Sequence, residues 1–270
     1  MKFSRITALV LIAFMLLAVA VYVATPLTQT GYVIRNIFYL SAPLIAILFG
    51  YIAIWNYGVP NRHALSLFFI VVGLSLWFVG ESIFFSYTLV NVDPFPSIAD
   101  LFYILGYIPL AIGFFRELNI LKVKLSGLET LTTLLAAGLF VGLVLYFGLV
   151  VAFDSSWGWL ASTVSISYNF GDVVLILTIL PVLIFVYRHR KGRVVQPWLW
   201  YVVALLLTLI ADILYSNFSD YYDVLDPLAT QIDLIWIVSY LCFGYGFAKQ
   251  AAILKELSSR AKPDKSLSRR

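Results

Sequence analysis

The stretch Ser97–Arg116, SIADLFYILGYIPLAIGFFR, sets the pattern for the chain, because the same arrangement occurs twice more. Asn169–Arg188 reads NFGDVVLILTILPVLIFVYR, and Thr230–Lys249 reads TQIDLIWIVSYLCFGYGFAK. Each copy opens with a small polar residue, places an aspartate three positions later and ends on a cation. A helix of this length rises about 28 Å, close to the hydrocarbon thickness of a bilayer. The sequence therefore predicts three copies of one membrane-spanning helix.

The three copies align without a gap at four kinds of position. These are the aspartates Asp100, Asp172 and Asp233; the small residues Gly106, Thr178 and Ser239; the cations Arg116, Arg188 and Lys249; and Pro109 and Pro181, with Cys242 in their place in the third copy. Agreement at both ends and in the middle indicates an internal repeat.

The composition is typical of a helical membrane protein. Of 270 residues, 62% are hydrophobic and 12% are charged, whereas about half of a soluble domain is apolar. Apolar runs long enough to span a membrane recur throughout the chain. Eight spans fit, at residues 6–24, 37–57, 65–88, 98–115, 130–153, 170–187, 198–216 and 231–248. We interpret the first as a transmembrane helix; a cleaved signal is the alternative, since Lys2 and Arg5 precede it.

The charged residues divide between two sides of the predicted membrane. With the N-terminus in the cytoplasm, the N-terminal segment, the inner connections and the tail hold every Lys and Arg except Arg35. Only four of the 14 acidic residues lie on that side, namely Glu117, Glu129, Glu256 and Asp264. This distribution follows the positive-inside rule at each loop. It predicts a multi-pass protein of the cytoplasmic (inner) membrane with both termini in the cytoplasm.

The predicted fold is an all-α integral membrane protein with eight transmembrane helices. The spans pair into four hairpins that all begin inside, so the hairpins are parallel repeats. Residues 1–250 form a single transmembrane domain, and residues 251–270 form a basic cytoplasmic tail. The basic inner segments predict contact with the anionic lipids of the bilayer rather than with nucleic acid.

The repeated aspartates have two interpretations. The small polar residue that opens each copy can cap its helix, and the aspartate three residues later completes a capping box near the positive end of the helix dipole. The alternative is a ring of aspartates, Asp100, Asp172 and Asp233, that binds a cation or an amine. The sequence leaves both open.

Glu81 and Asp212 have no capping role, because each lies inside an outward-going helix. Carboxylates at that depth are expensive in hydrocarbon, so we expect each to face the bundle interior, a wet cavity or a partner. Arg35 is the only outer cation that can pair with them. One interpretation is a buried ion pair; the other is a ligand-binding polar pocket that opens outward.

The sequence contains no recognisable catalytic motif. It has no HExxH or other His-rich metal motif, no G-x-S-x-G, no P-loop and no Rossmann glycine pattern, which predicts a protein that is not an enzyme and holds no metal or cofactor. Gly138 and Gly142 form a G-x-x-x-G motif, which we interpret as close packing within the chain.

The segment DPFPSIADLFYILGY at 93–107 resembles a motif in the multi-span N-terminal membrane modules of some bacterial GGDEF and EAL signalling proteins, which make and break cyclic di-GMP. The matched positions are Pro96, Ser97, Asp100 and Tyr107. The resemblance implies a membrane sensory module. The chain ends soon after its last span, so we expect output to pass through another protein.

These observations predict a membrane sensory or scaffolding module that recognises a ligand at an outward-facing polar pocket or within the bilayer and signals through a separate cytoplasmic partner. The candidate ligand-binding residues are Glu81, Asp212, Arg35, Asp100, Asp172 and Asp233. The alternative is a transporter or channel for a small cation or a proton. The largely apolar inner halves of the spans disfavour that alternative.

Overall fold

A computed structural model describes residues 2–58, 61–122, 124–152, 158–193, 195–218 and 227–261. Over these ranges the chain is helical and contains no strand. The helices are α1 (Lys2–Ala24), α2 (Gln29–Tyr57), α3 (Arg62–Leu89), α4 (Ile98–Leu121), α5 (Gly127–Ala152), α6 (Trp159–Arg188), α7 (Gln196–Phe218) and α9 (Pro227–Ala261). Within the described chain, eight helices are long and apolar enough to cross a membrane. The predicted all-helical class is confirmed.

Most of the described helices begin earlier than the apolar runs indicate. α2 begins at Gln29, α6 at Trp159 and α9 at Pro227, where the sequence predicts starts at 37, 170 and 231. In α6 the polar side chains of the extra turns bond back to carbonyls four residues earlier, as Thr163 does to Trp159 and Ser167 to Thr163, both at 2.8 Å. Such bonds satisfy the polar groups within the helix itself, so polarity does not end the helix there.

The earlier starts change the capping interpretation. In the first copy it is confirmed: the Ser97 hydroxyl accepts from the Ala99 N–H at 3.1 Å, and Asp100 accepts from the Ser97 N–H at 2.6 Å. In the second copy it is wrong, because the cap of α6 is Gly158 and Asn169 lies inside the helix. In the third copy Thr230 also lies within its helix, α9.

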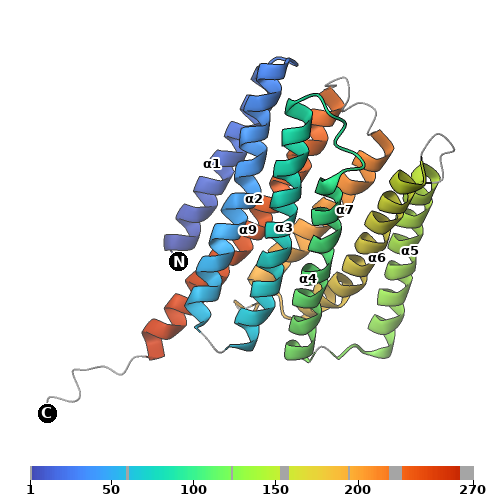
Figure 1. Cartoon of the computed structure of the whole chain (residues 1–270). Coiled ribbons are helices and arrows are strands. Elements are labelled where there is room, and N and C mark those ends of the chain that lie inside the picture. The colour runs from blue at the N-terminus through green and yellow to red at the C-terminus, as the bar shows by residue number, and fades with distance from the viewer. Residues whose placement is uncertain are drawn as a thin grey trace, which may run out of the picture.

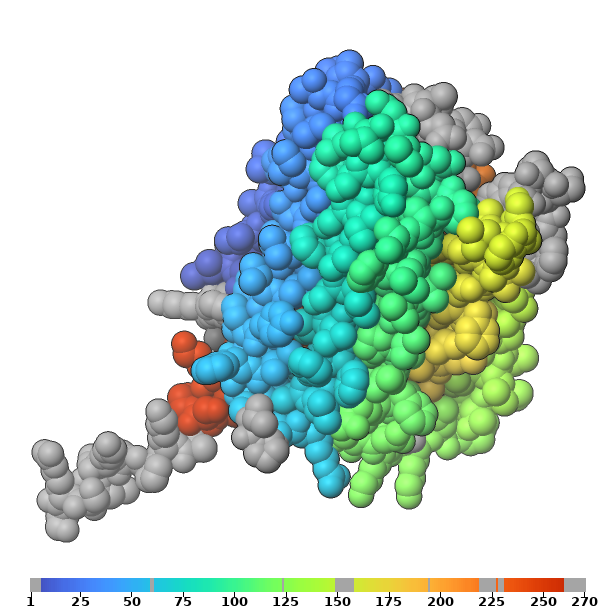
Figure 2. Space-filling view, in the orientation of Figure 1, coloured from blue at the N-terminus to red at the C-terminus, as the bar shows by residue number. Residues whose placement is uncertain are grey.

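The helices pack side by side with α9 crossing between others (Figure 1). α9 contacts α1, α2 and α7, while α3 packs along α4 and α5 packs mainly on α6 at one edge of the bundle. In the space-filling view α2, α3 and α4 form one continuous face (Figure 2). α1 begins and α9 ends toward the lower end of Figure 1. We call this the inner end and the opposite end the outer end, following the charge pattern of the sequence.

Glycines bring the backbones of α3 and α4 together. A Cβ at Gly73 would lie 2.8 Å from the Gly106 carbonyl oxygen, and one at Gly113 would lie 2.8 Å from that of Ser66. Only small residues permit such an approach between helices. By contrast, a Cβ at Gly138 or Gly142 of α5 would meet nothing within 4 Å. The predicted close packing of that motif within the chain is therefore wrong.

Candidate functional site

Five acidic residues in the outer half of the described chain share one feature, which is that each accepts a hydrogen bond from an aromatic side chain. We call the group the carboxylate–aromatic cluster. Its acids are Glu81, Asp100, Asp172, Asp212 and Asp233, and its donors are Tyr22, Tyr39, Tyr103, Tyr107, Tyr168, Trp236 and Tyr240. The cluster contains five of the six sequence-predicted site residues and links seven of the described helices.

Glu81 of α3 has the most donors. Its Oε1 accepts from the Tyr39 hydroxyl at 2.7 Å and from the Tyr240 hydroxyl at 3.4 Å. Its Oε2 accepts from the Tyr103 hydroxyl at 2.8 Å. These tyrosines come from α2, α9 and α4, so one carboxylate connects four helices. The ring of Tyr240 also packs edge-on against that of Tyr39, which fixes the positions of two of the donors.

Asp212 occupies in the helix pair α7–α9 the place that Glu81 occupies in the pair α3–α4. It accepts from the Trp236 indole N–H at 2.9 Å. Trp236 lies three residues after Asp233, as Tyr103 lies three after Asp100. In both pairs, therefore, the aromatic residue one turn after the repeated aspartate reaches back to an acid on the preceding helix.

Asp100 and Asp172 form a reciprocal arrangement between α4 and α6. The Tyr168 hydroxyl of α6 donates to Asp100 at 2.6 Å, and the Tyr107 hydroxyl of α4 donates to Asp172 at 2.7 Å. Both carboxylates are buried. Asp172 also interacts electrostatically with Asp212 of the adjacent α7, so two carboxyl groups lie near each other inside the bundle.

Asp233 connects the cluster to the first helix. It accepts from the Tyr22 hydroxyl of α1 at 3.3 Å. Asp233, Glu81 and Asp212 are half-buried, in contrast to Asp100 and Asp172. These three acids therefore form the accessible part of the cluster.

Arg35 does not act as the predicted counter-ion. It is 2% exposed, and its Nη1 donates to the carbonyl oxygens of Thr25 and Pro26, each at 3.2 Å. These carbonyls lie where α1 ends and lack helical partners, so the guanidinium binds them instead of Glu81 or Asp212. Its Nη2 is buried and has no hydrogen-bond partner in the described chain. The predicted pairing with those two acids is wrong.

The ion pairs found in the described chain all lie at the inner end. They join His63 to Glu117, Arg188 to Glu129, and Arg193 to Glu256. Neutral donors thus serve four of the cluster acids in the described chain, namely Glu81, Asp100, Asp172 and Asp212. A carboxylate has about four acceptor positions, so these donors leave capacity for a further ligand. Carboxylates among aromatic faces are suited to bind a cation, through charge and through cation–π attraction.

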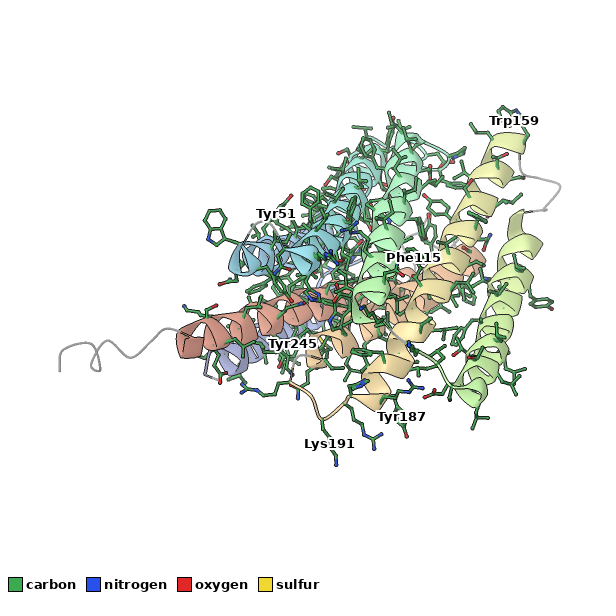
Figure 3. The ribbon with its side chains drawn as sticks, turned by 90° about the horizontal axis from the view of Figure 1, so that it is seen from below. Tyr51, Phe115, Trp159, Tyr187, Lys191 and Tyr245 are labelled. Carbon is green, nitrogen blue, oxygen red and sulfur yellow. The ribbon has the colours of Figure 1, made fainter. Side chains whose placement is uncertain are left out.

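Two surface hollows occur, and neither is lined by a residue of the cluster, so the predicted outward-facing pocket is neither of them. One surrounds the α6–α7 turn at residues 187–192, where Tyr187 and Lys191 project from the bundle (Figure 3). The other lies between α5 and α6 and is lined by apolar residues and Asn169. In the described chain no group of three or more His, Cys, Asp or Glu side chains is arranged to hold a metal ion.

Sequence reasoning identified the acids but missed their donors and a second polar group. Tyr103 and Tyr107 lie at helical spacing after Asp100, as Trp236 and Tyr240 lie after Asp233, and this shared spacing was an available signal. At the inner end, Tyr201 donates to the Gln250 side-chain oxygen at 2.8 Å. The inner half is therefore more polar than the apolar runs indicate.

Comparison of the chain with protein-family models, with curated proteins and with solved structures found no match. The resemblance of residues 93–107 to membrane modules of cyclic di-GMP signalling proteins stays a prediction. The function is accordingly argued from the geometry of the chain itself.

Proposed function

We propose that this chain is a multi-pass protein of the cytoplasmic membrane whose carboxylate–aromatic cluster recognises a small organic cation at the outer face. Binding is relayed through α9 to a separate cytoplasmic protein. The observation that carries the proposal is the Glu81 carboxylate, which accepts from three tyrosine hydroxyls inside the bundle and forms no ion pair within the described chain.

The membrane assignment is supported by the eight long apolar helices and by large apolar side chains exposed around the bundle. The orientation is supported by the placement of every Lys and Arg except Arg35 toward one side. Four parallel hairpins are supported by the contacts of α3 with α4, α5 with α6 and α7 with α9, whereas α1 contacts α9 as well as α2.

Cysteine labelling tests this orientation. Gly158 caps α6 and a Cβ there meets nothing within 4 Å, and Ser259 is exposed near the end of α9. In a Cys242→Ser background, an impermeant maleimide added to intact cells should modify Gly158→Cys. It should modify Ser259→Cys only after the cells are made permeable. The opposite pattern would contradict the proposed orientation.

The preference for a cation follows from electrostatics. Burying carboxylates in an apolar bundle is costly, and neutral hydroxyl donors offset only part of that cost. A bound cation would add charge-assisted contacts, which are about twice as strong as neutral ones. The aromatic donors would supply faces to an alkylated ammonium group. A protonated or quaternary amine therefore fits the cluster better than an anion or a neutral sugar does.

Thermal denaturation with matched ligands tests this preference. Choline, ethylammonium and putrescine are added to the protein in nanodiscs, with 3,3-dimethylbutanol as the neutral shape analogue of choline. At least one cation should stabilise the protein saturably, by about 2.7 kcal/mol at 100 times its dissociation constant, and the neutral analogue should not. Equal stabilisation by choline and its analogue would contradict recognition of the charge.

The proposed relay rests on the position of α9. This helix carries Asp233, Trp236 and Tyr240 at the outer end and continues to Ala261 at the inner end. There Glu256 accepts two bonds from Arg193, at 3.1 and 2.6 Å, and Leu257 is 52% exposed. A change at the outer cluster can thus reach the cytoplasmic side along one continuous helix.

A cation or proton transporter is the second candidate, and the α7–α9 interface favours it. Three pairs of polar side chains meet along the described part of this interface: Asp212–Trp236, Thr208–Ser239 at 2.7 Å, and Tyr201–Gln250. Between the last two, however, Leu205, Phe243 and Phe247 are fully buried and form an apolar layer. Flux of a cation or proton into liposomes that stops in Glu81→Gln would favour transport over relay.

A further inference from the structure

The inner end contains a buried carboxylate with an incomplete set of partners. Glu117 of α4 is 1% exposed, and its Oε1 lies 2.8 Å from Nδ1 of His63 on α3. Its Oε2 is buried and has no hydrogen-bond partner in the described part of the chain. Leaving a buried carboxylate oxygen unpaired is costly. The free energy of burying Glu117 therefore depends on the protonation state of its one hydrogen-bonding partner in the described chain, His63.

His63 is placed to exchange protons with the cytoplasmic side. Its side chain is 36% exposed, whereas that of Glu117 is 1% exposed. A neutral imidazole gives Glu117 at most one N–H, and only in one tautomer. A protonated imidazole gives it both a donor and a positive charge, which turns the contact into an ion pair. Protonation of His63 therefore decides whether the buried carboxylate is neutralised.

A chain of contacts connects this pair to α9. The His63 ring stacks on Tyr57 of α2, with ring centroids 5.8 Å apart. The Tyr57 hydroxyl accepts from the Gln250 side-chain amide at 2.6 Å, and Gln250, on α9, is 4% exposed. Movement of the imidazole thus acts on a ring whose hydroxyl is held by the helix that runs on to the cytoplasmic side.

The other charged and titratable groups near the pair come from the helices around it. Tyr57 and Tyr201 both interact electrostatically with Glu117. Arg116 is the neighbour of Glu117, and its guanidinium lies 5.9 Å from the centre of the Phe69 ring. Elsewhere at the inner end, Arg188 of α6 is paired with Glu129 of α5. In the part of the chain that the structure describes, no ion pair within 4 Å competes with His63 for Glu117.

We infer that His63 and Glu117 form a cytoplasm-facing proton-binding site whose occupancy is transmitted to α9 through Tyr57 and Gln250. This second input goes beyond recognition of a cation at the outer end and does not depend on it. The protein then responds to cytoplasmic pH as well as to its outer ligand.

The two histidines of the chain, His63 and His189, allow a direct test. Full-length protein in nanodiscs is prepared with isotope-labelled histidine and, in a Cys242→Ser background, with a fluorine tag on Ser259→Cys. The imidazole and fluorine signals are then followed by NMR as the pH is changed. Replacing exposed His189 by Gln assigns the two imidazole signals. We expect the fluorine signal to change with pH in step with the His63 signal, both in the otherwise unchanged protein and in His189→Gln.

Two variants that retain the His63 imidazole make the inference falsifiable. Glu117→Gln should move the midpoint of the His63 titration and leave that of His189 unchanged. Tyr57→Phe should keep the His63 titration but abolish the fluorine response, since it removes the hydroxyl that Gln250 binds. A fluorine response that persists in Tyr57→Phe, or a His63 midpoint that Glu117→Gln does not move, would overturn the inference. Neither result would bear on cation binding at the outer end.

Discussion

Replacing Glu81 by Leu is expected to lower the free energy of unfolding by about 3 kcal/mol or more. The substitution removes the acceptor of three tyrosine hydroxyls at once. Tyr39 and Tyr240 are 5% and 4% exposed, so water cannot readily replace the carboxylate. Each stranded hydroxyl costs about 1–3 kcal/mol. Chemical denaturation in detergent, followed by tryptophan fluorescence, measures the difference.

Two variants separate the loss of the acceptor from the loss of charge. Glu81→Gln retains an acceptor oxygen and should cost only about 1 kcal/mol. Asp93→Asn removes an exposed outer carboxylate that lies outside the cluster and should leave stability unchanged. If Glu81→Leu were as stable as Asp93→Asn, the carboxylate would not hold the four helices together.

The second large effect is expected at Asp100, where one carboxylate serves two elements. Asp100→Leu removes the acceptor of the Ser97 N–H in the capping box and that of the Tyr168 hydroxyl on α6. Loss of a cap costs about 1 kcal/mol, and a stranded buried donor adds about 1–3 kcal/mol. We therefore expect a loss of about 2–4 kcal/mol in the same denaturation experiment.

A double-mutant cycle separates the two roles of Asp100. Tyr168→Phe removes the donor on α6, so adding it to Asp100→Leu should restore part of the lost stability, with a coupling of about 0.5–3 kcal/mol. The cap contribution should remain lost in the double variant. Strictly additive effects would mean that the bond between α4 and α6 contributes nothing and that Asp100 acts only as a cap.

The helical class and the number of long apolar helices could be predicted, because the length of each apolar run can be read directly from the sequence. The residues at which the helices begin could not be predicted in the same way. The polar residues at 159–169 read as a loop, yet Ser165 accepts from the Asn169 side chain at 2.9 Å through its carbonyl oxygen, and the helix continues past both. This local bonding pattern depends on the helix already being formed, so polarity alone does not reveal it.

The acids of the candidate site could be predicted because a carboxylate within an apolar run stands out. Their partners could not, since tyrosine and tryptophan are common in membrane helices and only the packing shows which hydroxyl reaches which acid. The pairing of Arg35 with Glu81 or Asp212 was wrongly predicted for a similar reason. Opposite charges on one side of the membrane suggested a pair, but the carbonyls of Thr25 and Pro26 lie closer.

The inner polar group was missed because its members are scattered along the chain. Tyr57, His63, Glu117, Tyr201 and Gln250 come from five helices, and each alone resembles an ordinary helix-end residue. Polar residues near the ends of separate helices do not reveal that those residues meet. Their proximity is a property of the packing.

Calorimetric titration of organic cations into wild-type protein, Glu81→Gln and Asp93→Asn tests the central claim most directly. If the carboxylate–aromatic cluster recognises a cation, at least one of choline, ethylammonium and putrescine should bind wild-type protein and Asp93→Asn with equal affinity. The same cation should bind Glu81→Gln at least about tenfold more weakly, a loss of about 1.4 kcal/mol. Equal affinity for Glu81→Gln and wild-type protein, or no saturable binding of any of these cations, would contradict the account.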